Sequence, residues 1–283
     1  MITCAGTVGK CIIYNGEDSY YQDSNIVWID NPNEIISNDF LYHLLSKINW
    51  SHLNSTTIVR IYNDDLRKLK LYYPEHDEQK KINNLFQLIN ERIATQNKII
   101  DKLQSLIKGI AQKIVHNNKP NVRLAECLEC KSSTLQESEV CEQGTYPVYG
   151  ANGIVGYLDN YSTEGEAVYI IKDGSGVGTV SYVTGKCSAT GTLNILQAKE
   201  GYSLQYFYYL LKVLNFEPYK TGMAIPHIYF KDYGKAKVFC PSYTEQLQYA
   251  RLLSAIDNKL SAEQHILTNL SSQKQYLLRQ MFI

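Results

Sequence analysis

One glycine-rich stretch of this sequence, Gly174-Ser-Gly-Val-Gly178, has the composition of a phosphate-binding loop. A nucleotide loop also needs a Gly-Lys-Ser/Thr ending, which is missing here, and a dinucleotide fingerprint needs a helix that starts at its last glycine. The residues that follow, TVSYV, are typical of a strand instead. We therefore expect a tight turn between two strands, in which glycine supplies a positive φ, and no nucleotide site.

Cys127 and Cys130 have the spacing of a metal or redox pair. A structural zinc site needs a second pair of ligands, and only Cys141 follows nearby. The surrounding sequence lacks the βαβ pattern of a thioredoxin-like motif. Because the chain has seven cysteines, an odd number, free thiols in a reducing cytoplasm are expected. The sequence thus predicts no metal and no cofactor.

Lysine, tyrosine and asparagine near glycine turns offer a third kind of chemistry, the binding of nucleic acid. Five lysines but only two acidic residues lie between Lys212 and Lys237. Lysine holds backbone phosphates, whereas Asn, Gln, Ser and Tyr reach base edges. For each residue taken alone, a solvated surface role is the alternative, and a structural turn role is the alternative for His227. The candidates, best first, are the loop of Lys220, Thr221 and Gly222, and then His227, Tyr219, Lys231, Tyr149, Asn152, Lys172 and Arg60.

The elements that must position these residues occur twice in the chain. Residues 58–79, IVRIYNDDLRKLKLYYPEHDEQ, align with residues 225–246, IPHIYFKDYGKAKVFCPSYTEQ, at a constant separation of 167 positions. A second match lays AGTVGKC, from Ala5, over GSGVGTV, from Gly174. The chain is therefore predicted to be an internal duplication, in which Arg60 corresponds to His227. The positions identical in both copies are Ile58, Ile61, Tyr62, Asp65, Lys68, Lys70, Pro74, Glu78 and Gln79.

A long helical pattern follows each repeated segment. Apolar residues recur every three or four positions from Ile82 to Ile114 and again from Tyr249 to Met281, which is the spacing of a coiled-coil seam. A polar residue interrupts both seams at the same repeat position, and such a residue can fix the register of two paired helices. We predict that the helices pack on each other, with two amphipathic helices on separate cores as the alternative. The expected seam includes Ile89, Gln96, Leu103, Ile256, Glu263 and Leu270.

The region between the two helices reads as an α+β unit. Asn117 to Pro120 should end the first helix, because proline cannot continue it. Short β-rich runs (YPVYG, EAVYIIK, TVSYVTG, LNILQ and KAKVFC) then alternate with glycine, asparagine and aspartate. One helix is expected at Ser203–Leu214, where SLQYFYYLLKVL has apolar residues at helical spacing.

The composition bounds the class of protein. The 283 residues include 28 basic and 28 acidic side chains, so a protein that simply coats nucleic acid is disfavoured. The length favours about two domains. No apolar run reaches the roughly 18 residues of a membrane span, and no secretory signal follows Met1. A cytoplasmic protein with no membrane contact is expected.

The ordered set YPVYGANGIVGYLDNY, VYIIKDGSGVGTVSY, GMAIPHIYFKDY and PSYTEQ resembles the target-recognition domain of type I restriction–modification specificity subunits. The resemblance covers nearly the whole chain. It implies two recognition units, each followed by a long helix, with the helices paired as an antiparallel coiled coil. The expected boundaries are 1–76 for recognition domain 1, 77–117 for the first spacer helix, 118–242 for recognition domain 2 and 243–283 for the second spacer helix.

The resemblance also implies the function. Such a subunit has no catalytic centre, binds double-stranded DNA, and directs adenine methylation by methyltransferase subunits and cleavage by a restriction subunit. The first unit lacks a counterpart of YPVYGANGIVGY, so it is expected to be truncated at its N-terminal side, and pairing with another specificity chain is one way to complete it. The alternative is a non-enzymatic β-rich scaffold that binds protein or glycan and oligomerises through the coiled coil.

Overall fold

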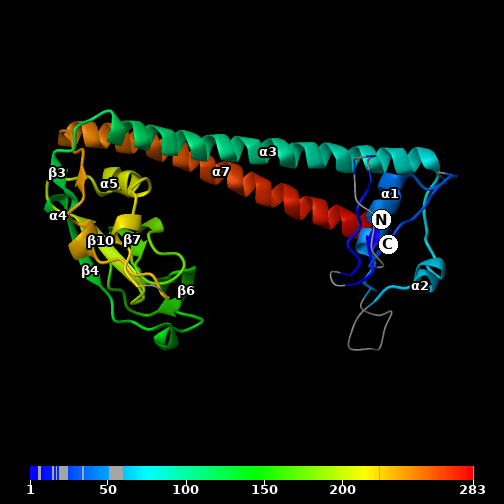
Figure 1. Ribbon diagram of the computed structural model, residues 1–283, viewed down its shortest axis with the longest axis horizontal. Coiled ribbons are helices and arrows are strands. Elements are labelled where there is room, and N and C mark those ends of the chain that lie inside the picture. The colour runs from blue at the N-terminus through cyan, green and yellow to red at the C-terminus, as the bar shows by residue number, and fades with distance from the viewer. Residues whose placement is uncertain are drawn as a thin grey trace. The chain divides into compact units, whose positions relative to one another are not determined.

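The computed structural model of the chain describes residues 1–5, 8–14, 16, 18, 25–33, 35–50, 60–222 and 224–282. Gly6, Thr7 and Ile58, which belong to the aligned repeat sequences, lie outside the described residues. The chain forms two compact units, of which unit 1 comprises Met1–Ile100 with Ala262–Ile283 and unit 2 comprises Asp101–Ser261 (Figure 1). None of the helices in the described ranges combines the length and apolar composition that a bilayer span requires.

Two long helices, α3 (His76–His116) and α7 (Tyr243–Met281), contribute to both units. Within unit 1, Gln96 and Glu263 are buried at equivalent repeat positions. The Gln96 side-chain amide donates to the backbone oxygen of Glu263 at 3.1 Å and also to its carboxylate. The two polar seam positions therefore bond to each other, while coiled-coil pairing along the whole of both helices stays a prediction.

The buried stripe of each long helix differs from the predicted seam near its start. Leu85 and Leu252 were expected in the seam but are exposed, whereas the next residues, Phe86 and Leu253, are fully buried. In α3 the reason is packing against other elements, because the Phe86 ring lies 4.8 Å from the ring of His43 and 5.8 Å from that of Phe282. The first turns of α3 therefore pack against α1 (Asn38–Lys47) and Phe282, and not only against α7.

Unit 1 contains two small hydrophobic clusters, and the short helix α1 contributes side chains to both. Ile2, Cys4, Leu45, Trp50 and Ile61 form one cluster. The other gathers side chains from α1, from α3 and from the residue that follows α7: Phe40, Leu44, Ile82, Phe86 and Phe282. Besides the long helices, the described elements of this unit are β1 (Ile2–Thr3), β2 (Ile26–Val27), α1 (Asn38–Lys47) and α2 (Asn63–Arg67).

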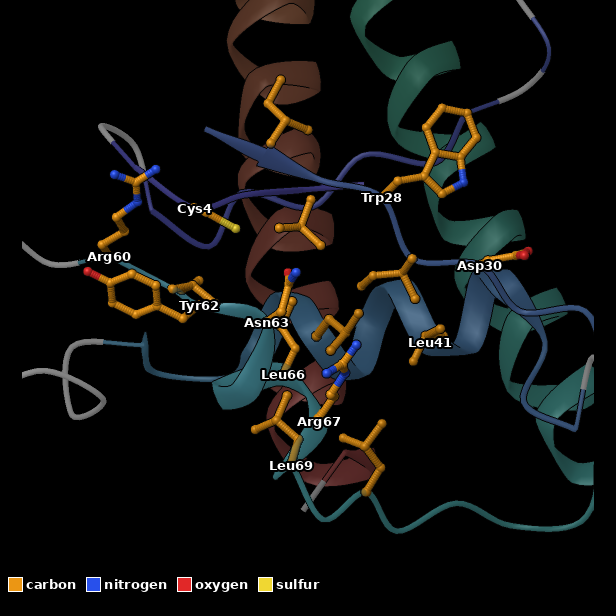
Figure 2. A pocket seen from close by; sticks show the side chains of 16 residues that line it. Cys4, Trp28, Asp30, Leu41, Arg60, Tyr62, Asn63, Leu66, Arg67 and Leu69 are labelled. Carbon is orange, nitrogen blue, oxygen red and sulfur yellow. The ribbon is translucent and has the colours of Figure 1, made fainter. Parts of the chain in front are cut away.

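A pocket of about 860 Å³ opens in unit 1 between β2, α1 and α2 (Figure 2). Trp28, Leu41, Leu66 and Leu69 are among the side chains that line it, and Arg60 lies at its margin in the view. Trp28 is 51% exposed, which is unusual for a tryptophan beside a core.

Unit 2 contains the larger sheets. One has the strand order β4-β10-β7-β8 with antiparallel pairing throughout, and a second has the order β6-β5-β9 with β5 and β9 parallel. A third, with the order β11-β3, is antiparallel. The strands are β3 (Val122–Arg123), β4 (Leu128–Ser132), β5 (Tyr146–Gly150), β6 (Gly153–Leu158), β7 (Glu166–Ile171), β8 (Val180–Thr184), β9 (Ser188–Ala189), β10 (Leu193–Ala198) and β11 (Lys237–Val238). The helices are α4 (Leu124–Cys127), α5 (Leu204–Leu211) and α6 (Phe230–Tyr233), with 3₁₀ turns η2 (Glu137–Glu139) and η3 (Glu217–Tyr219).

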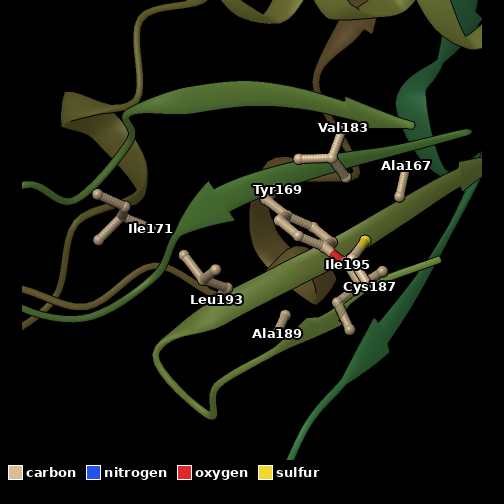
Figure 3. Close-up of a cluster of buried hydrophobic side chains, with 8 residues drawn as sticks. All are labelled: Ala167, Tyr169, Ile171, Val183, Cys187, Ala189, Leu193 and Ile195. Carbon is tan, nitrogen blue, oxygen red and sulfur yellow. Dashed lines mark hydrogen bonds between the residues drawn. The ribbon is translucent and has the colours of Figure 1, made fainter. Parts of the chain in front are cut away.

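A hydrophobic core cluster of unit 2 joins side chains of β7, β8 and β10 to those at and just before β9 (Figure 3). Tyr169 is fully buried, and its hydroxyl bonds Thr163 Oγ1 and Cys187 Sγ, both at 3.2 Å. A buried tyrosine hydroxyl needs such partners because desolvation without them is costly. The cluster consists of Ala167, Tyr169, Ile171, Val183, Cys187, Ala189, Leu193 and Ile195.

A glutamine in the first turn of each long helix makes the same bonds in both units. Gln79 accepts from the Ser37 backbone N–H at 2.8 Å and donates to the Pro74 carbonyl at 2.9 Å. Gln246 accepts from Ser203 N–H at 2.9 Å and donates to the Pro241 carbonyl at 2.9 Å. Ser37 and Ser203 are the N-caps of α1 and α5, so the duplication extends to the contacts that join these elements.

The strands that lead into the two glycine turns make equivalent backbone bonds. Ile61 N–H donates to the Cys4 carbonyl at 3.0 Å, and Ile228 N–H donates to the Lys172 carbonyl at 2.9 Å. Gly178, in the turn between β7 and β8, has φ +90°, and a Cβ there would lie 3.1 Å from the Phe216 ring. The prediction of a glycine turn between two strands is confirmed.

The mixed helix-and-sheet fold was predicted, and so were most strands of unit 2. The helix expected at Ser203–Leu214 runs only over Leu204–Leu211, and the strand expected at KAKVFC is limited to Lys237–Val238. The first long helix ends at His116, directly before the expected breaker. Several short elements, among them α1, α4 and β2, were not predicted, because two to ten residues carry little periodicity.

Candidate nucleic-acid interface

The loop favoured by the sequence analysis forms a closed hairpin in unit 2. Thr221 and His227 exchange backbone hydrogen bonds of 2.8 and 2.7 Å, which draw the ends of the loop together. Gly222 has φ +88°, and a Cβ at this position would collide with the Ile225 carbonyl oxygen. Thr221 and Gly222 are therefore held at an exposed loop whose shape depends on glycine.

This hairpin joins the glycine turn that follows β7. Gly174 N–H donates to the Pro226 carbonyl at 3.0 Å. His227 Nδ1 and Asp173 Oδ1 lie 2.6 Å apart, so the carboxylate orients the imidazole ring. The same backbone strand brings Lys172 into place, since its carbonyl accepts from Ile228 N–H.

Tyr149 belongs to the same end of the sheets. Thr190 N–H donates to its carbonyl at 2.8 Å, and the hydroxyls of Thr190 and Thr192 bond each other at 2.8 Å. Thr192 in turn accepts from Lys172 N–H at 3.0 Å. The Tyr149 ring packs on Tyr169, with centroids 5.7 Å apart, so much of this side chain is used in the core. Asn152 is exposed in the turn that leads from β5 to β6.

The cationic candidates have partners that the sequence analysis did not foresee. Lys220 Nζ lies 2.5 Å from Glu217 Oε1, an ion pair across η3. Lys231 Nζ lies 5.2 Å from the centre of the Tyr229 ring, and that ring is 47% exposed. The spacing of three positions between Glu217 and Lys220 is the sequence signal that could have identified the pair.

Arg60 belongs to unit 1, whereas the other candidates belong to unit 2. Its guanidinium carbon lies 6.0 Å from the centre of the Tyr62 ring, and Tyr62 is the repeat equivalent of Tyr229. In each unit a cation therefore lies over the exposed tyrosine at this repeat position, Tyr62 in unit 1 and Tyr229 in unit 2. A cation beside an exposed aromatic ring favours both phosphate contact and base stacking. The sequence analysis did not select Tyr62 or Tyr229, although their identity in the repeat was visible. Tyr219 is half-buried at the end of η3.

The structure thus brings Lys172, Thr221, Gly222, His227 and Tyr149 together at one end of unit 2, and the backbone bonds above link them. Asp173 and Glu217 add negative charge there, which orients His227 and Lys220 but also opposes phosphate. This surface therefore offers positioned polar groups and not net positive charge alone.

Cys127 is buried in unit 2, and Cys130 is partly buried. Burial raises the pKa of Cys127 to about 12, with Cys240 adding to the effect, and burial raises the pKa of Cys130 to about 11. Both groups are therefore protonated at neutral pH, and a protonated thiol is a poor metal ligand and nucleophile. In the part of the chain that the structure describes, no three His, Cys, Asp or Glu side chains are placed to hold a metal ion.

The raised pKa of Cys127 makes stability depend on alkaline pH. Because the folded pKa lies above the unfolded value, the stabilisation is complete below about pH 9 and is lost as the pH rises toward 12. The Cys127→Ala variant should therefore lose less stability than the parent between pH 9 and 10.5, by about 1.4 kcal/mol per pH unit. Urea unfolding at several pH values measures this, with exposed Cys141→Ala as the control. Equal slopes for all three proteins would contradict the assignment.

The comparisons with known proteins agree on one family. The sequence profile described as type I restriction modification DNA specificity domain matches residues 1–105 and 118–272. The chain is 38% identical over 112 residues to the putative type I restriction enzyme specificity subunit S.HindORF215P of Haemophilus influenzae, covering 40% of this chain and 26% of the relative. It is 28% identical over 116 residues to the type I restriction enzyme EcoprrI specificity subunit of Escherichia coli, covering 41% and 29%. The matches thus span less than a third of these relatives.

Solved structures share the fold. The S subunit of a type I restriction–modification system from M. genitalium matches with a TM-score of 0.65 and 22% identity, covering 88% of this chain and 73% of that one. A chain from a structural study of complex assembly in the type I system matches with a TM-score of 0.57 and 16% identity, covering 86% and 70%. These findings do not favour the alternative of a protein- or glycan-binding scaffold.

Proposed function

Because this chain belongs to the family of type I restriction–modification DNA specificity domains, we propose that it is a non-catalytic subunit that selects the DNA target of a type I restriction–modification complex. The observation that carries the proposal is the extent of the family match, which includes both repeats and most of both long helices. The specificity subunits named above support it.

The DNA would be read by unit 2 through the loops that meet at one end of its sheets. Lys220 and Lys231 supply charge for phosphates, while Thr221, Asn152 and His227 supply groups that can bond base edges. With His227 Nδ1 engaged by Asp173, the Nε2 atom is the ring nitrogen available to DNA. Arg60 and Tyr62 would play the part of Lys231 and Tyr229 in unit 1.

The long helices would act as a spacer, paired as an antiparallel coiled coil, between recognition domains at 1–76 and 118–242. The bond from Gln96 to Glu263 supports this pairing, because it joins equivalent positions of the two copies. Exposed basic residues of α3 would dock methyltransferase subunits, which perform adenine methylation, and a restriction subunit would add cleavage. Such residues include Lys80, Lys81, Arg92, Lys98, Lys102 and Lys113.

Lys220→Ala should weaken binding to double-stranded DNA of random sequence by about three- to tenfold, because a phosphate contact is lost and the Glu217 carboxylate is left without its cation. The slope of log affinity against log salt should fall by about 0.9. Fluorescence anisotropy at several salt concentrations measures both quantities.

Lys186 offers a matched control, because it is also paired with a glutamate, Glu164, at 3.7 Å. The pair lies at the opposite end of β7 and β8 from Gly174–Gly178, as the antiparallel register from Glu166–Thr184 to Ile170–Val180 requires. Lys186→Ala should leave DNA affinity unchanged, and Glu217→Gln should preserve or raise it. Equal losses in the Lys220 and Lys186 variants would count against the loop, and an absence of salt-dependent DNA binding in the parent chain would count against the proposed function.

A further inference from the structure

The pocket of unit 1 has apolar walls contributed by two segments far apart in the sequence. One wall is formed by β2 and the residues that follow it, from Ile26 to Asp30, and the other by α2 and the chain beyond it to Leu71. Figure 2 shows Trp28, Leu41, Leu66 and Leu69 arranged around the open space. Asp30, Arg60 and Arg67 also line the pocket, so an occupant would meet charged groups as well as apolar side chains.

The first wall of the pocket contains β2, and unit 2 has a corresponding strand whose neighbours can be compared with those of β2. Strands β1 and β2 pair Ile2 with Val27, and β7 and β10 pair Ile170 with Asn194, in the same antiparallel sense. Strand β10 is therefore the counterpart of β2. Its second edge is paired with β4, through Leu196 with Cys130 and Ala198 with Leu128 among others. The second edge of β2 has no strand partner among the described residues.

The second wall, formed by α2 and the chain to Leu71, corresponds to the segment of unit 2 that ends in β11. Strand β11 pairs with β3, and Leu124 N–H donates to the Ala236 carbonyl at 3.0 Å. Ala125 N–H donates to the Gly234 carbonyl at 2.9 Å. The repeat places Leu69 and Arg67 where Ala236 and Gly234 stand in unit 2. In the described part of unit 1, no residue donates to the carbonyl of Leu69 or Arg67.

The difference in burial follows the same correspondence. In unit 2, Leu124, Cys127 and Leu128 of the segment that runs from β3 to β4 are almost completely buried. The residues beneath this segment are buried as well, and their exposure is 0% for Tyr233, 8% for Ala236 and 4% for Val238. Their equivalents in unit 1, Leu66, Leu69 and Leu71, are only half-buried.

We propose that the pocket of unit 1 is a docking site for a polypeptide segment of the form strand, helical turn, strand, with the chemical pattern of Asn121–Ser132. Such a segment would add one strand to β2 and another to the chain at Lys70–Leu71, and would place apolar side chains at the positions of Leu124, Cys127 and Leu128. An asparagine at its start could bond both backbone groups of Tyr73, as Asn121 does at 2.8 Å with the N–H and the carbonyl of Cys240. This inference does not depend on the proposed DNA function.

A synthetic peptide with the sequence of residues 121–132, NVRLAECLECKS, tests the proposal on the full chain. Fluorescence titration should show saturable binding, and hydrogen–deuterium exchange should show new protection at residues 26–30 and 66–71. A peptide with Leu124→Asp and Leu128→Asp should bind at least about tenfold more weakly, since two buried leucines are replaced by charges. A control peptide with Glu129→Gln, at an exposed position, should bind like the parent.

Variants of the protein give an independent readout. Leu69→Asp should weaken binding of the parent peptide at least about tenfold, whereas Tyr72→Asp, at a 78% exposed side chain nearby, should not. If Leu69→Asp impairs folding, the comparison between the parent peptide and the doubly substituted peptide still tests the proposal. Equal binding of the parent and the doubly substituted peptide, protection confined to unit 2, or no saturable binding would overturn the proposal.

Discussion

Gln246→Leu is expected to lower the free energy of unfolding by about 3 kcal/mol, because it removes the partners of buried backbone groups. The Gln246 side chain is 2% exposed. Its carbonyl accepts from Ser203 N–H, and its amide donates to the Pro241 carbonyl and to Cys240 Sγ. Leucine fills similar volume but offers neither a donor nor an acceptor, so the Ser203 N–H would stay buried without a hydrogen bond and the partly buried Pro241 carbonyl would lose its partner.

The duplication supplies an internal comparison for this result. Gln79→Leu removes bonds to Ser37 N–H and to the carbonyls of Pro74 and Ile35, and should be about as costly for unit 1. Gln87→Leu is the control, because Gln87 lies on an exposed face of α3 and should change stability by less than about 0.5 kcal/mol. Urea unfolding monitored by circular dichroism measures all three. If the Gln246 and Gln87 variants lost similar stability, the buried bonds would not have the importance assigned to them.

The second large effect is expected at the contact between the long helices. Gln96→Leu should destabilise unit 1 by about 2–4 kcal/mol, since it removes a donor from the buried carboxylate of Glu263, which is 6% exposed. The double variant Gln96→Leu, Glu263→Leu should recover most of this loss, because two apolar residues can replace a buried polar pair.

Thermal unfolding of the parent, both single variants and the double variant completes this cycle. A double variant whose loss of stability equals the sum of the two single losses would show that the two side chains do not act as a pair. Recovery of stability with a change in oligomeric state would show that the polar pair also specifies which helices associate.

The sequence identified the repeated architecture because a duplication leaves the same residue types at a fixed separation. Burial of one face of a long helix imposes a period that is visible over ten turns, so the two helices were evident. Pro74, Gln79 and their equivalents marked the same junction twice. The choice between a nucleotide loop and a β-turn at Gly174–Gly178 was also decided locally, by the strand that follows.

The candidate DNA residues were selected by type, and only the tertiary structure showed which of them lie together. Lys172, His227 and Tyr149 are far apart along the chain but meet through the backbone bonds of adjacent loops. The pairing of Asp173 with His227 and of Glu217 with Lys220 was not predicted, because an acidic residue near a proposed phosphate site carries no signal until its partner is known. Arg60 belongs to unit 1 and was selected only through its alignment with His227.

By itself, then, the sequence determined the positions of the two long helices and of several main strands, the duplication and the family, all of which follow from local pattern and residue identity. The tertiary structure decided which carbonyls Gln79 and Gln246 bond, that Gln96 meets Glu263, and that a face covered by Leu124–Leu128 in unit 2 is open in unit 1. The physical reason is that hydrogen bonds and burial depend on the distances between segments far apart in the chain. A local sequence pattern does not contain those distances.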